Sequence, residues 1–161
     1  KDVADRNAFI EKIFISSAAG SDMCPVQQVE ALEGRGLQGD RYANGTGYWV
    51  LVDNCQVTLI ESEDLEKVQS VTGVQIANGE HRRNLVTRGI QLDMLLGRRF
   101  RIGEAVFEYD RPRPPCSYLA SITESGITNA LADRAGICVR VLQSGMIRCG
   151  DPIVIVEKTE A

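Results

Sequence analysis

Short apolar runs separated by glycine-rich or polar turns are the feature that most restricts the fold of this chain. Strands are predicted from these runs at residues 9–15, 26–32, 56–60, 84–87, 99–102, 105–109, 138–142 and 153–157. The runs do not alternate regularly with helical patterns, which disfavours a doubly wound parallel sheet. We therefore expect a β-rich, mixed α+β fold, built as a barrel or sandwich with a few short helices.

Three short helices are predicted between these strands. The first has Ser62 as its N-cap, acidic residues in its first turn and Gly73 as its end. The other two cover residues 117–122 and 127–135. Segment 34–42 contains so many glycines that we expect no regular element there.

The overall composition predicts one globular domain over residues 1–161. Of the 161 residues, 43% are hydrophobic and 25% are charged, and no linker or repeat divides them. The net charge of −4 disfavours general nucleic-acid binding, so any polyanion must be bound by a local patch. No apolar run reaches about 18 residues and the N-terminus lacks a signal-peptide pattern, so we expect no membrane partner.

The cysteines predict free thiols rather than a disulfide framework. They are Cys24, Cys55, Cys116, Cys138 and Cys149, an odd and scattered set without a C-x-x-C pair. Together with a single histidine, this spacing also disfavours a structural zinc site. We therefore expect a compartment in which thiols stay reduced, the cytoplasm, and interpret every cysteine except Cys116 as structural.

Cys116 is the cysteine whose surroundings indicate chemistry. It follows Pro114 and Pro115, which fix the backbone, and it precedes the helix predicted at Ser117. The positive end of a helix, with Arg113 just upstream, favours a thiolate over a thiol. The alternative interpretation is a buried, inert cysteine, and the local sequence does not decide between the two.

Arginines form the second candidate constellation. Arg82 and Arg83 precede Asn84 in a loop after Gly79, and their planar guanidinium groups are suited to phosphate or carboxylate. The alternative is a solvated strand face that pairs with acidic neighbours. We favour that alternative for three of the arginines, with Glu104, Glu108 and Asp110 as partners, namely Arg98, Arg99 and Arg101.

Two weaker signals complete the set of candidates. Asp40 and Arg41 follow Gly39 in a turn, where we favour a loop-organising aspartate over a catalytic acid. His81 is the one histidine, so it is the only base that a Cys116–His81 hydrolase pair can use. We favour the simpler interpretation of His81 as an exposed loop residue. No phosphate-binding glycine loop or dinucleotide motif occurs.

In their order along the chain, these motifs resemble MOSC domains, a family named for the C-terminal domain of molybdenum cofactor sulfurases. The matching segments are Gly36–Tyr42 (GLQGDRY), Arg82–Val86 (RRNLV), Leu96–Gly103 (LGRRFRIG), Pro115–Cys116 and Gly150–Val154 (GDPIV). The likeness covers residues 10–157. It implies a MOSC-type barrel, similar to the pyruvate kinase barrel, and a site for the molybdenum cofactor (molybdopterin).

The resemblance also implies roles for particular residues. Cys116 would be the catalytic residue, which carries sulfur as a persulfide or ligates molybdenum. The cofactor's anionic groups would be held by six residues, namely Asp40, Arg41, Arg82, Arg83, Asn84 and Arg113. Pyridoxal phosphate binding is a further property associated with the family.

Some members of that family reduce N-hydroxylated compounds with electrons from a redox partner protein. This chain lacks the additional N-terminal β domain of those reductases, so the resemblance favours a sulfur-carrier or cofactor-handling role, with a sulfur donor or redox protein as partner. The alternative function is a non-catalytic module that binds a nucleotide or another anion with the same arginines. Neither the substrate nor the oligomeric state follows from the sequence.

Overall fold

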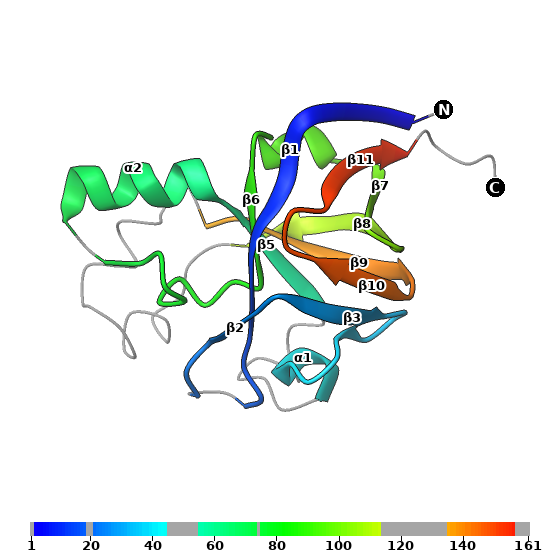
Figure 1. Cartoon of the computed structure of the whole chain (residues 1–161), viewed down its shortest axis with the longest axis horizontal. Coiled ribbons are helices and arrows are strands. Elements are labelled where there is room, and N and C mark those ends of the chain that lie inside the picture. The colour runs from blue at the N-terminus through cyan, green and yellow to red at the C-terminus, as the bar shows by residue number, and fades with distance from the viewer. Residues whose placement is uncertain (1, 19–20, 45–54, 74, 114–134, 157–161) are drawn as a thin grey trace.

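Seven strands close into a barrel in the computed structural model, which describes residues 2–18, 21–44, 55–73, 75–113 and 135–156 (Figure 1). The barrel strands are β1 (Asp2–Ile15), β5 (Val57–Glu61), β6 (Leu85–Arg88), β7 (Arg99–Ile102), β8 (Ala105–Pro112), β9 (Ile137–Gln143) and β11 (Pro152–Val156). Their order is β11-β7-β8-β9-β5-β6-β1, and antiparallel pairing of β1 with β11 closes the ring. The structure therefore confirms the predicted β-rich barrel.

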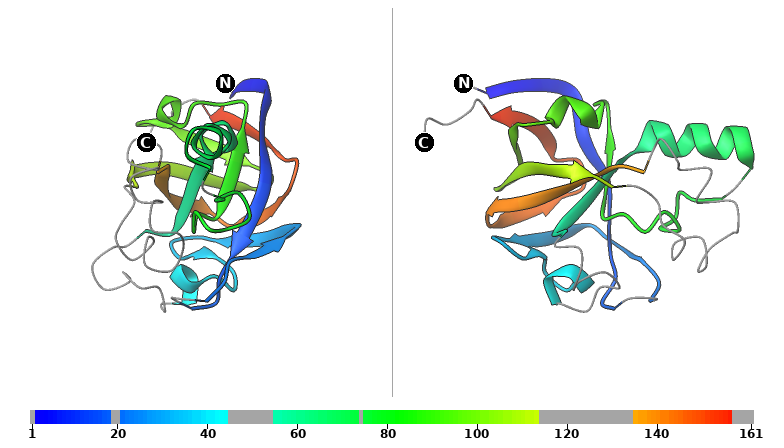
Figure 2. Two further views of the ribbon diagram at one scale, coloured as in Figure 1. Left: turned by 90° about the vertical axis from the view of Figure 1, so that its left-hand side faces the viewer. Right: turned by 180° about the vertical axis from the view of Figure 1, so that it is seen from behind.

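A smaller sheet and short helices surround the barrel. The sheet has the order β10-β3-β4, and β2 extends the barrel sheet beside β1. The bounds of these elements are β2 (Cys24–Val26), β3 (Gln28–Leu32), β4 (Gly36–Leu37), β10 (Gly145–Arg148), α1 (Arg41–Asn44), α2 (Ser62–Thr72) and the 3₁₀ helix η1 (Leu92–Leu95). Figure 2 shows α2 projecting away from the barrel. No helix in the described residues is long and apolar enough to cross a membrane.

The barrel interior is filled by alternate residues of its strands. In β7, Phe100 and Ile102 are fully buried, while Arg99 and Arg101 on the other face are half-buried. The rings of Phe100 and Phe107 stack across β7 and β8 with centroids 5.7 Å apart. Each such large side chain stabilises the fold by about 1.5–3 kcal/mol when it is fully buried.

Most predicted strands are confirmed, with shifted ends. Segment 26–32 is instead two strands, β2 and β3, separated at Gln27, and β10 was not predicted. Segment 34–42, where no regular element was expected, contains β4 and the start of α1. The predicted end of α2 is confirmed, because Gly73 adopts a left-handed φ of 74°. The predicted N-cap was wrong. Glu61 holds that position, and the Ser62 hydroxyl donates to Glu11 instead of capping the helix.

The cysteine prediction needs a correction. Cys55 and Cys138 form a disulfide, with a Cα–Cα distance of 5.8 Å. Antiparallel pairing of β5 with β9 places Cys138 beside Thr58, close to the residue that precedes β5. The two cysteines are separated by 83 positions in the sequence, so their spacing gave no sign of this pairing. The burial predicted for Cys138 is confirmed, and both helices predicted after Cys116 fall largely outside the described residues.

Candidate functional site

Five polar residues gather in the interior at one end of the barrel. We call them the arginine cluster: Asp40, Arg41, Arg82, Arg83 and Asn84. They come from the β4–α1 turn and from the segment that leads into β6. None has more than 6% of its surface exposed, so these charges lie almost wholly out of water. Arg113, which follows β8, and Tyr42 of α1 border the cluster.

Asp40 is the central acceptor of the cluster. Its Oδ1 accepts hydrogen bonds from the Ser16 amide at 3.0 Å and from the Asn84 side chain at 3.2 Å. Arg41 forms a salt bridge with the same oxygen at 3.2 Å, and Oδ2 accepts from the amide of Tyr42. These are the bonds expected of the loop-organising aspartate that the sequence favoured. Because Asp40 is fully buried, it supports the site and offers no surface to a ligand.

Asn84 ties the cluster to three segments of the fold. Its Nδ2 donates to the Phe14 carbonyl at 3.0 Å as well as to Asp40. Its Oδ1 accepts from both the amide and the hydroxyl of Thr58 at 3.1 Å, and its own amide donates to the Thr58 hydroxyl. The side chain is fully buried, so Asn84 positions its neighbours rather than contacting a ligand.

The two consecutive arginines reach in different directions because the backbone turns sharply between them. Arg82 has a positive φ of 63°, which non-glycine residues adopt rarely and usually where the surrounding structure enforces it. Its guanidinium donates to the Ser21 carbonyl, and its carbonyl accepts from Arg41 at 3.1 Å. Arg83 points elsewhere, with Nε donating to the Ala135 carbonyl at 2.8 Å.

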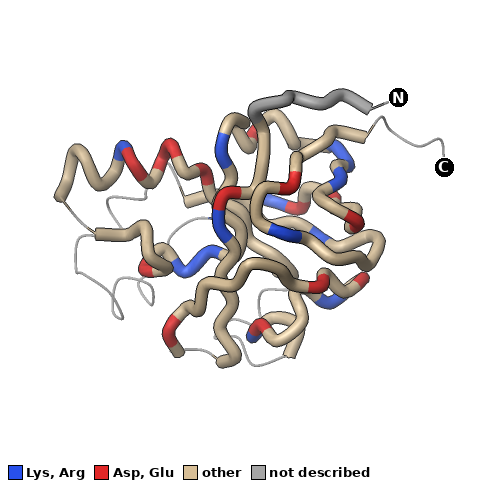
Figure 3. The backbone as a smooth tube through the Cα atoms, in the orientation of Figure 1, with Lys and Arg blue, Asp and Glu red and all other residues tan. Residues whose placement is uncertain are grey.

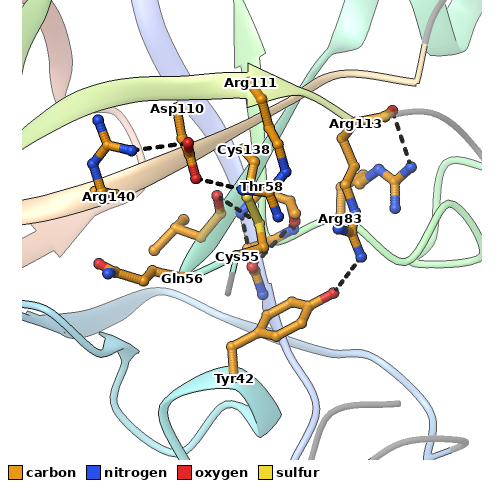
Figure 4. Close-up of a disulfide and its surroundings, with 12 residues drawn as sticks. Tyr42, Cys55, Gln56, Thr58, Arg83, Asp110, Arg111, Arg113, Cys138 and Arg140 are labelled. Atoms are coloured by element: carbon orange, nitrogen blue, oxygen red, sulfur yellow. Dashed lines mark hydrogen bonds and ion pairs between the residues drawn. A yellow bond between two sulfur atoms is a disulfide. The ribbon is translucent and has the colours of Figure 1, made fainter. Parts of the chain in front are cut away.

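Arg113 lies between Arg83 and Tyr42 at the border of the cluster and is bonded to both (Figure 4). The guanidinium of Arg83 also donates to the Arg113 carbonyl, while the Arg113 guanidinium donates to the Tyr42 hydroxyl at 3.0 Å. The Tyr42 ring carries Arg41 at 4.5 Å and Arg113 at 5.9 Å from its centroid. These cation–π contacts hold the guanidinium groups and leave their positive charge in place.

His81 overturns its sequence interpretation, because it is fully buried rather than an exposed loop residue. Its Nδ1 accepts the amide hydrogen of Arg83 at 2.9 Å, which assigns the proton of the neutral ring to Nε2. That Nε2 is buried without a hydrogen-bond partner among the described residues. Burial, followed by the positive charges of Arg83, Lys12 and Arg82, lowers the pKa of His81 to about 3. A base with this pKa is poorly suited to activating a thiol at neutral pH.

Other arginines are paired with carboxylates on the outer barrel surface, as predicted for Arg99, which lies 3.6 Å from Glu108. Arg140, which the sequence did not single out, bridges Glu108 at 3.0 Å and Asp110 at 2.8 Å. Arg111 forms an ion pair with Asp110 at 2.6 Å. Basic and acidic positions are accordingly interspersed on the barrel strands (Figure 3).

The structure thus brings together the six residues predicted to hold an anionic group. Cys116, predicted as catalytic residue and metal ligand, lies outside the described residues. Among the residues that are described, no group of three or more histidine, cysteine or acidic side chains is suited to a metal ion. Tyr42 and Thr58 were not predicted as site residues from the sequence. Tyr42 directly follows the Asp40–Arg41 pair, whereas Thr58 is an ordinary strand residue without a distinguishing signal.

Comparisons with known proteins agree on one fold. The model of the MOSC domain family matches residues 46–154, and none of the curated proteins matches the sequence. The crystal structure of YuaD from Bacillus subtilis superposes with a TM-score of 0.78 at 18% identity, covering 96% of this chain and 97% of that one. YiiM from Geobacillus stearothermophilus gives 0.73 at 24% identity, covering 93% and 75%. YiiM from Escherichia coli gives 0.67 at 20%, covering 95% and 72%.

Proposed function

Because this chain belongs to the MOSC domain family, we propose that it binds the molybdenum cofactor, with the anionic groups of the cofactor held at the arginine cluster. The observation that carries the proposal is the gathering of three buried guanidinium groups in one cluster, those of Arg41, Arg82 and Arg83. Buried cations require compensation, because the interior solvates charge far less well than water. A phosphate group supplies that compensation.

The donor set of the cluster fits a phosphorylated ligand. Guanidinium groups bind phosphate in two-pronged fashion, and those of Arg41, Arg82 and Arg83 are held in part by backbone carbonyls that leave their charge in place. The Nε2 hydrogen of His81 adds a buried donor next to Arg82. In this proposal Arg83 and Arg113 contact the anion, while Asp40 and Asn84 hold the surrounding segments in place.

Cys116 completes the proposal as the residue that ligates molybdenum or carries sulfane sulfur. A soft thiolate is a ligand suited to either element. When bound, the cofactor supplies a redox-active metal centre, which the described side chains do not provide by themselves. The activity proposed is therefore cofactor handling or sulfur transfer, or reduction of N-hydroxylated compounds, with a sulfur donor or redox protein as partner.

The test is metal and sulfane-sulfur analysis of protein purified without air from a host that makes the cofactor. Wild type should retain molybdenum, and Arg83→Ala should lower its content at least about tenfold through loss of a charge-assisted contact. Cys116→Ser should abolish sulfane sulfur or release the metal. Arg140→Ala, on the outer surface, is the matched control and should retain wild-type content. Equal molybdenum in wild type and Arg83→Ala would contradict the proposal.

A second candidate function is an anion-binding module that does not use the thiol. It is favoured by one observation, namely that backbone carbonyls hold Arg83 and the Tyr42 hydroxyl holds Arg113, so that both guanidinium groups are positioned by the barrel itself. This function predicts that inorganic phosphate raises Tm equally in wild type and Cys116→Ser, with no rise in Arg83→Ala. Molybdenum bound in wild type and lost in Cys116→Ser would exclude it.

A further inference from the structure

The Cys55–Cys138 disulfide lies beside the arginine cluster, and the residues around it include Arg83, Arg113 and Tyr42 (Figure 4). Cys55 precedes β5, and Cys138 is the second residue of β9. Cys138 pairs in register with Thr58, the residue whose hydroxyl and amide hold Asn84. The disulfide is therefore attached to the backbone that supports the cluster.

The segment just before β9 holds both Arg83 and Arg113. The carbonyl of Ala135 accepts from Arg83 Nε at 2.8 Å, and the carbonyl of Gly136 accepts from the Arg113 amide at 2.9 Å. These acceptors lie three and two residues before Cys138. The position of both arginines thus depends on where this short segment sits, and the disulfide connects it to Cys55.

Reduction of this disulfide removes the covalent link between the segment before β5 and the second residue of β9. Two sulfur atoms in a bond lie about 2.05 Å apart, and two thiols cannot approach so closely. Cys138 is fully buried and Cys55 is 4% exposed, so both sulfur atoms are enclosed by protein atoms and not by water. Gly136 packs so tightly on the Leu59 carbonyl that it has no room for a side chain. We therefore expect separation of the sulfur atoms to shift the segment before β9 relative to the segment before β5.

We propose that Cys55 and Cys138 form a redox-controlled clamp, which holds Arg83 and Arg113 in their anion-binding positions when oxidised and loosens them when reduced. The inference deepens the proposed function and rests on it for the anion. In the reducing step, a dithiol attacks the Cys55 sulfur, the S–S bond breaks, and Cys138 leaves as a thiolate that takes up a proton. The second thiol of the reductant then releases Cys55 and closes a cyclic disulfide, so two electrons and two protons have passed to the protein.

The test compares oxidised and dithiothreitol-reduced wild type, with the thiol count fixed by alkylation and mass spectrometry. Titration calorimetry with pyrophosphate should show at least about tenfold weaker binding after reduction, the size of effect expected when one charge-assisted contact is lost. The Cys55→Ala/Cys138→Ala variant should bind like reduced wild type and ignore dithiothreitol. The matched control, Cys24→Ser/Cys149→Ser, should keep the full redox response.

Amide hydrogen exchange supplies a readout that needs no ligand. Exchange at the Arg113 amide should rise at least about tenfold on reduction, because its acceptor on Gly136 becomes mobile. A rise in exchange without any pyrophosphate binding by the oxidised protein would support the clamp and contradict the proposed anion site. Unchanged exchange after both thiols are alkylated would overturn the clamp. So would a disulfide that dithiothreitol cannot reduce in the folded protein.

Discussion

The two ends of strand β6 use arginine in opposite ways. Before the strand, Arg83 is buried and donates hydrogen bonds to the backbone carbonyls of Ala135 and Arg113. At its far end, Arg88 is partly exposed and forms ion pairs with Glu11 at 2.7 Å and Glu66 at 2.6 Å. Carbonyl oxygens position a guanidinium without cancelling its charge, whereas two carboxylates neutralise it.

This difference separates the end of β6 at which we propose anion binding from the end at which arginine is paired with carboxylates. Around Arg88, charge and hydrogen bonds are satisfied by side chains of β1 and α2, and Ser62 adds a contact at 2.9 Å. This arrangement, which we call the Arg88 network, fastens α2 to the barrel. Around Arg83, backbone carbonyls hold the buried guanidinium and leave its positive charge in place. Four pairs of measurements test this contrast, in order of decreasing expected effect.

Gly136→Ala should have the largest effect, because it displaces the carbonyls that hold Arg83 and Arg113. Gly136 has a φ of 92°, and an added Cβ would collide with the Leu59 carbonyl. We expect the free energy of unfolding to fall by at least about 3 kcal/mol, measured by urea denaturation. Gly150 is the matched control, with a φ of 93° and open space around it. Gly150→Ala should lower stability by only about 1 kcal/mol, and equal losses would contradict the packing explanation.

Asn84→Ala should come next. It leaves buried groups of Asp40, Thr58 and Phe14 without the hydrogen bonds that Asn84 provides. We expect a loss of about 3 kcal/mol in urea unfolding. At the other end of β6, Ser62→Ala removes hydrogen bonds from a group nearer to water and should cost about 1 kcal/mol. If the Ser62 variant proves less stable than the Asn84 variant, the two ends do not differ as we describe.

The pH dependence of the free energy of unfolding should also distinguish the two ends of β6. The pKa of His81 is lowered from 6.5 to about 3 in the folded protein. Between these two pH values the unfolded chain therefore binds a proton at His81 that the folded protein does not bind. Stability from this residue is complete above pH 6.5 and falls as the pH drops toward 3. Between pH 8 and pH 5 the loss should be about 2 kcal/mol. His81→Gln should abolish this part of the pH dependence in urea titrations, and an unchanged profile would show that His81 is not held neutral.

The smallest effect is expected for Glu11 in the Arg88 network. Burial raises the pKa of Glu11, but hydrogen bonds from Arg88 and Ser62 and the charges of Arg88 and Lys12 outweigh it, so the net shift is downward. A lowered carboxylate pKa adds stability above about pH 4.5 that is lost as the pH falls through the folded value. Glu11→Gln should therefore lower stability by no more than about 1 kcal/mol at pH 7. The difference from wild type should shrink as the pH falls through the folded pKa, and a constant difference would rule out the charge as its cause.

Local patterns in the sequence predicted most barrel strands and the helix α2, because alternation and terminal residues act within a few positions. The strand β10 was missed because Met146 and Ile147 make too short an apolar run, and the strand is defined by pairing with β3 much earlier in the chain. No pattern in the neighbouring sequence indicates that His81 is buried or that Cys55 pairs with Cys138. Both depend on which segments the closed barrel brings together.

The candidate site was predictable to a different degree. Clustered arginines and the Gly39–Asp40–Arg41 turn identified the residue types and the correct loops. Their division of labour was not predictable, since only the hydrogen bonds show that Asp40 and Asn84 serve as internal supports. The positive φ of Arg82, which aims two adjacent guanidinium groups at different segments, also lies beyond any sequence pattern.

Closure of the barrel by β1 and β11 has a consequence for folding during synthesis. The pairing joins Val3 to Ile155, so β1 leaves the ribosome long before β11, the strand that closes the barrel against it. Contacts between such distant residues slow folding, and an unpaired strand edge is a site for association with other chains. We expect the nascent chain to be most prone to aggregation, and most dependent on chaperones, in the interval between the release of β9 and that of β11.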